Sequence, residues 1–269
     1  MKFSKKMMFG AAALMMAASL VFTGCRDEEG SSVVDIKWDL AGNNATVLGT
    51  NDSDDAYARS FSSMRTKHID YTATATWNKG NAGVIGVMFG MSKNADGSYN
   101  FGIVGLGDTA GTNPRYYVNH YVNVDPITMV GASSDFLNTS GSPAVVDVDC
   151  PWTPLSGITA DEDGNFTVAV KVELKGDAEG GDGYYEVTLG TALEADGTIA
   201  AANKKGTKVV GKTTKFTDED GNNVKYSATD ADNTQTDAGV YANVYNGKSL
   251  SATVAFSNIR KYDDVADGE

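Results

Sequence analysis

Tyrosine and asparagine alternate in two segments of the chain, and together these residue types are suited to binding sugars. Read as strands, the segments present these side chains on one face each: Tyr117, Asn119, Tyr121, Asn123, Tyr241, Asn243 and Tyr245. Tyrosine rings stack on the apolar faces of sugars, and asparagine amides both donate and accept hydrogen bonds with hydroxyl groups. If both strands lie on one concave sheet, they form a glycan-binding groove. The alternative is that the tyrosines pair across strands and stabilise a sheet without any ligand.

The acidic residues do not show the paired carboxylates that glycoside hydrolysis requires. Asp147 and Asp149 have a suitable spacing, but they lack a third acid and are more typical of a solvated strand edge. The chain has two histidines, His68 and His120, and no Gly-x-Ser-x-Gly motif accompanies them, so a nucleophilic triad is not indicated. We therefore predict a protein without catalytic activity.

Two loops are rich in the oxygen ligands that calcium prefers. The first contains Asp52, Asp54 and Asp55, and the second spans residues 218–222. Neither loop has the Gly at position 6 and the Glu at position 12 of an EF-hand loop. Solvated hairpin turns explain both loops better, although the sequence leaves room for one structural calcium ion at the first.

The composition excludes several classes of protein. The chain has 269 residues, with 22 Lys and Arg against 35 Asp and Glu, and a formal net charge of −13. Such a chain does not have the clustered positive charge that nucleic-acid binding requires, so we expect no nucleic-acid partner. Two cysteines cannot form a disulfide scaffold, and two histidines make a histidine-based metal site a poor expectation.

The N-terminus has the three parts of a secretory signal peptide. Lys2, Lys5 and Lys6 precede an apolar run over residues 7–22, which is too short to span a bilayer of about 30 Å. The run ends in small residues before Cys25, and residues 20–25 resemble the lipobox of bacterial lipoproteins. The resemblance implies cleavage before Cys25 and lipid attachment to it. An ordinary signal peptide is the alternative.

The lipid on Cys25 would attach the chain to the bacterial outer membrane, because several acyl chains give stable anchoring. Arg26 and the acidic residues that follow resemble the short export signal of surface-exposed lipoproteins of the Bacteroidetes type. The same residues could be a solvated tether, so the domain is expected to be surface-exposed or periplasm-facing. Cys150 then has no partner and is predicted to be a buried thiol.

Alternation of apolar and polar residues indicates strands with one buried face. The pattern runs through residues 69–77, 166–174 and 250–256. Residues 84–89 are almost continuously apolar, which predicts a strand covered on both faces. Residues 191–237 are the weakest part of the pattern and are expected to hold two or three short strands.

Asp-Gly pairs separate the predicted strands, and both residues tolerate the positive φ of tight turns. Residues 88–106, with such a turn inside, form the clearest predicted hairpin. We predict four parts: a signal peptide over 1–24, a lipidated cysteine and acidic tether over 25–32, one all-β antiparallel sandwich over 33–262, and a frayed acidic tail over 263–269.

Two closing segments extend this interpretation. Residues 239–245, a Gly-led strand, and residues 251–259, with their Phe-x-Asn-Ile ending, resemble the last strands of concanavalin A-like jelly rolls. The hairpin over residues 83–106 is similar to a central hairpin of that fold. The resemblance implies a jelly-roll sandwich from a group that includes lectins, glycan-binding modules and glycoside hydrolases, and the fold alone does not choose among them.

The leading functional prediction is a non-catalytic module for glycan binding or adhesion, with a polysaccharide as partner. The second is a structural lipoprotein that contacts another envelope protein, and the third is a hydrolase or lyase of the same fold. A glycan array run with and without calcium would separate these readings.

Overall fold

The computed structural model describes residues 34–53, 55, 57–64, 68–80, 83–93, 96–108, 114–127, 145–175, 184–210 and 237–261. Within these ranges, the side chains of residues 68–69, 108, 122–123, 145–152, 208–210, 237 and 261 are not part of the description. The predictions for Cys25 and Asp54, and for the side chains of Asn123 and Cys150, therefore lie outside the described residues. Among the described residues, no helix has the length and apolar character needed to cross a membrane.

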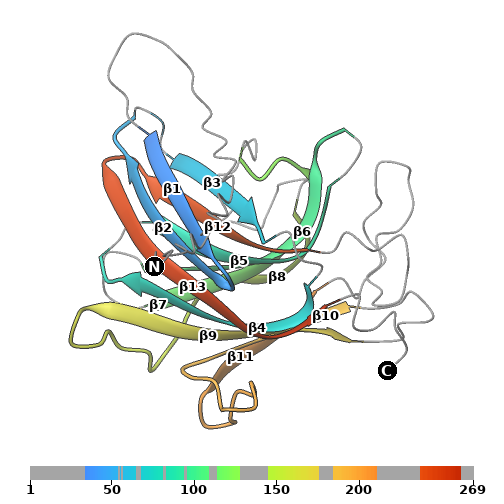
Figure 1. Cartoon of the computed structure of the whole chain (residues 1–269). Helices are drawn as coiled ribbons and strands as arrows, with labels where there is room; N and C mark the ends of the chain where they lie inside the picture. Colours follow the sequence, from blue (N-terminus) through green and yellow to red (C-terminus); the bar gives the residue numbers. More distant parts are fainter. Residues whose placement is uncertain are drawn as a thin grey trace, which may run out of the picture.

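Two antiparallel sheets stack into a sandwich, as the sequence predicted (Figure 1). The seven-stranded sheet has the order β1 (Val34–Ala41), β2 (Asn44–Asn51), β13 (Lys248–Lys261), β4 (His68–Asn78), β9 (Asn165–Lys175), β10 (Tyr184–Gly190) and β11 (Lys204–Val210). The six-stranded sheet has the order β3 (Tyr57–Ser63), β12 (Asp237–Tyr245), β5 (Gly83–Lys93), β6 (Tyr99–Asp108), β7 (Pro114–Val124) and β8 (Val145–Pro154). The described residues form strands, turns and loops without a helix.

The main core lies between the two sheets. From the seven-stranded sheet, alternate residues of β4, β9 and β13 point inward, including Trp77, Phe166 and Phe256, which confirms the predicted alternation. The six-stranded sheet contributes Val87, Phe89 and other residues of its inner face. Burial of these apolar side chains provides the main driving force for bringing the two sheets together.

Strand β5 is buried on both faces, as its continuous apolar sequence predicted. Its inner residues join the main core, whereas Val84 and Met88 belong to a second apolar cluster on the outer face of the six-stranded sheet. Phe101 and Tyr117 from β6 and β7 belong to this second cluster too. The six-stranded sheet therefore has two buried faces.

The turns follow the predicted chemistry. Gly97, Gly164 and Gly197 each have a φ near +80° to +90°, and each follows an aspartate. The predicted hairpin is the antiparallel pair β5–β6. In the weak stretch after residue 190, residues 191–203 form a hydrogen-bonded loop and β11 follows it, while residues 211–236 lie outside the described residues.

Candidate functional site

The two tyrosine–asparagine segments lie on the same face of the same sheet. They are strands β7 and β12, which β5 and β6 separate. The cross-strand register sets Tyr241 opposite Gly86, Gly86 opposite Gly105, and Gly105 opposite Tyr117. Two glycines therefore lie between the two tyrosines, and the Tyr117 ring occupies the space above Gly105, where a Cβ would be 2.1 Å from the ring.

A second row of residues crosses the sheet two residues away from the first row along each strand. It runs from Arg59 on β3 through Asn243, Val84 and Gly107 to Arg115 on β7. Sequence reasoning did not include the two arginines, because neither belongs to a tyrosine–asparagine repeat. Only the register of the folded sheet brings Arg59 beside Asn243, which is 184 residues later in the chain.

We call this surface the tyrosine face. It contains the described tyrosines and asparagines of the two repeats and three residues that the register adds to them, Tyr57, Arg59 and Arg115. The full set is Tyr57, Arg59, Arg115, Tyr117, Asn119, Tyr121, Tyr241, Asn243 and Tyr245. Figure 1 shows β12 beside β3, although the two strands are far apart in the sequence.

The end of β7 departs from simple alternation. Tyr99 pairs with Val124 and Phe101 with Tyr121, so three steps along β7 match two steps along β6. Such a bulge reverses the facing of the residues beyond it. Val124 accordingly belongs to the outer cluster with Tyr121, although simple alternation from Tyr121 would place it on the inner face. The face of Asn123 therefore cannot be inferred from alternation.

Most of the tyrosine face is buried. Tyr117, Asn119 and Tyr241 are 0% exposed, and Tyr121 and Asn243 are 3% exposed. Their rings do not offer the open, shallow stacking surface that the sequence suggested. Accessibility is found instead at one end, where Tyr57, Arg59, Tyr245 and Arg115 are half-buried.

The half-buried end is built by aromatic and cation–π contacts. The rings of Tyr57 and Tyr245 meet edge to face with their centroids 5.4 Å apart. The guanidinium of Arg59 lies over the Tyr57 ring, 5.4 Å from its centroid. These contacts hold Arg59 at the sheet surface, beside Asn243.

Several buried polar atoms on this face lack a hydrogen bond. Within the part of the chain that the structure describes, Arg59 Nε, Asn119 Oδ1 and Asn243 Oδ1 have no hydrogen-bond partner. The other side of the Asn119 amide is used, because its Nδ2 donates to the Tyr121 hydroxyl at 3.3 Å. A buried polar atom without a partner costs about 1–3 kcal/mol, so a ligand that supplies the missing hydrogen bonds would be stabilised here.

The hydroxyls of Tyr117, Tyr241 and Tyr245 stay protonated at neutral pH. Burial raises the pKa of Tyr117 and Tyr241, and Arg59 lowers both to a smaller extent. Burial also raises the pKa of Tyr245. Protonated hydroxyls can donate hydrogen bonds to a ligand but cannot act as bases.

His120 lies on the opposite side of β7 from the tyrosine face. It is 0% exposed, and its neighbours Tyr116 and Val118 on the strand belong to the layer between the sheets. Burial lowers the pKa of His120 to about 3, so the side chain is neutral at physiological pH. His120 therefore lies inside the sandwich and is not part of the tyrosine face.

The first predicted calcium loop is organised by an asparagine. Asn51 is buried, and its Oδ1 accepts hydrogen bonds from the Ser53 backbone N–H at 3.1 Å and the Ser53 hydroxyl at 2.6 Å. Asp52 and Asp55 are exposed, and Asp54 lies outside the described residues. Across the described residues there is no group of three or more His, Cys, Asp or Glu side chains that could hold a metal ion. The calcium site stays a prediction.

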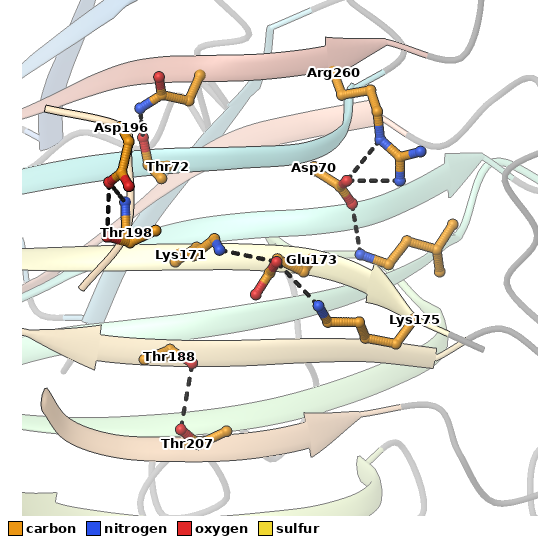
Figure 2. A network of polar contacts seen from close by, with 12 residues as sticks. Asp70, Thr72, Lys171, Glu173, Lys175, Thr188, Asp196, Thr198, Thr207 and Arg260 are labelled. Carbon is orange, nitrogen blue, oxygen red and sulfur yellow. Dashed lines mark hydrogen bonds and ion pairs between the residues drawn. The ribbon is translucent and has the colours of Figure 1, made fainter. Parts of the chain in front are cut away.

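The outer face of the seven-stranded sheet is built differently (Figure 2). Three of its cations are paired with acids: Arg260 with Asp70 at 2.6 Å, and Lys171 and Lys175 with Glu173 at 2.9 and 3.0 Å. By contrast, no ion pair is present for Arg59 or Arg115 within the described part of the six-stranded sheet.

Comparison with known proteins places the chain in no family, since no family matches it and no curated protein matches it either. Among solved structures, a mutant of the alginate lyase Aly36B in complex with an alginate tetrasaccharide is similar. The TM-score is 0.35 and the sequence identity is 9%, over 83% of this chain and 85% of that chain. So low a similarity says nothing of a shared ligand or reaction.

Proposed function

We propose that the chain is a lipid-anchored, non-catalytic protein of the bacterial cell envelope that binds glycans at the half-buried end of the tyrosine face. The observation that carries the proposal is a set of buried polar atoms that have no hydrogen-bond partner among the described residues and lie beside half-buried tyrosines. Asn243 Oδ1 needs a donor and Arg59 Nε needs an acceptor, and both lie next to the Tyr57–Tyr245 ring pair. A sugar offers hydroxyl groups that do both and an apolar face that packs against a ring.

The proposal of binding without catalysis has chemical support. Sugar hydrolysis by general acid–base catalysis needs two carboxyl groups across the bond. Among the side chains that the structure describes on β3, β5, β6, β7 and β12, none is acidic. Tyr117, Tyr241 and Tyr245 have raised pKa values, and His120 faces the interior. The described face thus offers hydrogen bonds and packing rather than proton transfer.

The test of glycan binding uses tyrosines of similar exposure on the two sheets. We expect Tyr245→Ala to weaken binding about tenfold in affinity electrophoresis against a panel of polysaccharides, since an aromatic stack contributes roughly 1–2 kcal/mol. Tyr184→Ala, which removes a half-buried tyrosine from the seven-stranded sheet, should leave binding unchanged. The assay is run with and without calcium. If no polysaccharide binds under either condition, glycan binding is wrong.

The lipid anchor is proposed on the sequence of residues 2–25, with its positive start, apolar run and small residues before Cys25. Cys25→Ala should move the protein from the membrane fraction to the soluble fraction of cells, and it should remove labelling by a radioactive fatty acid. Protease treatment of intact cells then tells whether the domain is surface-exposed or periplasm-facing. A membrane-bound, unlabelled Cys25→Ala variant would contradict lipid anchoring.

A further inference from the structure

We propose that the tyrosine face selects acidic sugars, with Arg59 as the residue that binds the carboxylate of a uronic acid unit. This inference rests on the proposed glycan-binding function and names the class of glycan. It starts from charge: the chain carries a net charge of −13, yet the described side chains on this face include arginines and no acid.

Three cations of the seven-stranded sheet provide a contrast with Arg59, because each is paired with an acid. On the seven-stranded sheet, Arg260, Lys171 and Lys175 each contact a carboxylate at 3.0 Å or less. In the described part of the six-stranded sheet, Arg59 has no carboxylate partner, and its buried Nε makes no hydrogen bond. Arg59 hydrogen-bonds the Tyr241 hydroxyl, but its Nε has no acceptor among the described residues, so the partly buried guanidinium can still bind an anion from outside the chain.

Local geometry supports a carboxylate rather than a free, mobile anion. The Tyr57 ring holds the guanidinium at 5.4 Å, which fixes the planar group that pairs with a carboxylate through two parallel hydrogen bonds. Asn243 is directly opposite Arg59 in the register, and no donor among the described residues reaches its Oδ1. A sugar acid has both complementary groups, because its carboxylate accepts from Arg59 and a neighbouring hydroxyl donates to Asn243.

Arg115 provides a second arginine for carboxylate binding, at the far end of the row that begins at Arg59. It lies on the same face four strands from Arg59, which places the two Cα atoms about 19 Å apart at the usual strand spacing. No ion pair of Arg115 is present among the described residues. A polymer with a carboxylate on each sugar could therefore meet a cation at both sides of the face, whereas a single small anion could meet only one.

The experiment compares polygalacturonate with the same polymer after chemical reduction of its carboxyl groups, so that only the charge differs. We expect the full chain to bind the acidic polymer at least about tenfold more tightly, as charge-assisted hydrogen bonds predict. Arg59→Gln should abolish this preference and bind both polymers alike. Lys171→Gln changes the net charge equally but removes a paired cation from the other sheet, so it should keep the preference.

The outcomes separate this inference from the glycan-binding proposal. If neither polymer nor any neutral glycan binds, both fail. If the two polymers bind equally, the tyrosine face binds glycans but the preference for acids is wrong. If Arg59→Gln and Lys171→Gln weaken binding to the same degree, the effect is long-range charge and Arg59 is not the anchor. Arg59→Lys should keep only part of the preference, because lysine lacks the planar fork. Thermal melts verify that each variant is folded.

Discussion

The two outer faces of the sandwich are both built from antiparallel strands, but they differ in how their polar side chains are hydrogen-bonded. On the seven-stranded sheet, hydroxyl side chains pair across strands, as Thr76 does with Thr167 at 3.1 Å and Thr188 with Thr207 at 3.3 Å (Figure 2 shows the second pair). Asp70 accepts from the Leu174 backbone and from Arg260, each at 2.6 Å. Each of these polar groups has a partner from the chain.

The tyrosine face is polar in composition but buried in position. Tyr117, Asn119 and Tyr241 are 0% exposed, and the amide oxygens of Asn119 and Asn243 have no partner among the described residues. The difference teaches that residue type alone does not mark a functional face. Threonine pairs and lysine–glutamate pairs are typical of a solvated surface, whereas the unsatisfied polar groups at low exposure are the reason we propose a ligand site on the tyrosine face.

The largest effect that we expect is a loss of folding stability at acidic pH, and it originates in the six-stranded sheet. His120 has a pKa lowered to about 3 from 6.5, so the unfolded chain binds a proton that the folded chain does not. Stability contributed by neutral His120 is thus present above pH 6.5 and is lost as the pH falls toward 3, by about 3 kcal/mol at pH 4. Chemical denaturation of the wild type and His120→Gln between pH 7 and pH 4 measures it, since the variant should lose less stability over this range.

A matched variant on the seven-stranded sheet tests the lower pH range, in which a carboxyl group titrates rather than a histidine. Burial raises the pKa of Glu173, but the hydrogen bonds and charges of Lys171 and Lys175 together outweigh it and lower the pKa from 4.5. The stability that Glu173 contributes is therefore present above pH 4.5 and disappears as the pH falls through the lowered pKa. Glu173→Gln should therefore leave the slope between pH 7 and pH 5 unchanged. If it flattens that slope as much as His120→Gln does, the assignment of the steep region to His120 is wrong.

The second effect is steric. Gly105→Ala would place a Cβ 2.1 Å from the buried Tyr117 ring, so we expect it to lower the free energy of unfolding by about 2–3 kcal/mol. Replacing glycine by alanine in a strand is otherwise favourable by about 0.5 kcal/mol, so the sign itself is diagnostic. Ala255→Thr adds atoms to the half-exposed outer face of β13 and should change stability by less than about 0.5 kcal/mol. Equal melting temperatures for the two variants would mean that the Tyr117 ring does not lie on Gly105.

Sequence patterns predicted the parts of this fold that follow from local chemistry. Alternation located β9 and β13, a continuous apolar run identified β5 as a doubly buried strand, and Asp-Gly pairs marked turns such as the one at Gly97. These signals work because the period of a strand and the φ of a turn residue are properties of a few neighbouring residues.

The candidate site was predictable only in part. The two tyrosine–asparagine segments could be placed on strands, but the presence of Arg59 beside Asn243 depends on pairing between distant strands. A single extra residue between Tyr121 and Val124 reversed the facing of the strand end, and no local pattern announced it. Burial of Tyr117 could not be predicted either, because tyrosine suits an exposed face and a buried one equally well.

The smallest effect is the most informative about function, because it has opposite signs on the two faces. Asn243→Leu removes a buried amide oxygen that has no partner in the described chain, so we expect unfolding to cost about 1 kcal/mol more. Thr76→Val on the seven-stranded sheet removes one side of a satisfied hydroxyl pair and should lower stability by about 0.5 kcal/mol. Both changes keep a side chain of similar size, and denaturant titrations of the two variants give the signs of the two stability changes.

A stabilised Asn243→Leu variant that also binds polysaccharide more weakly would identify Asn243 as a residue kept for a ligand at the expense of stability. A destabilised variant would mean that the amide is already satisfied in the folded chain, and the tyrosine face would then differ from its counterpart only in packing.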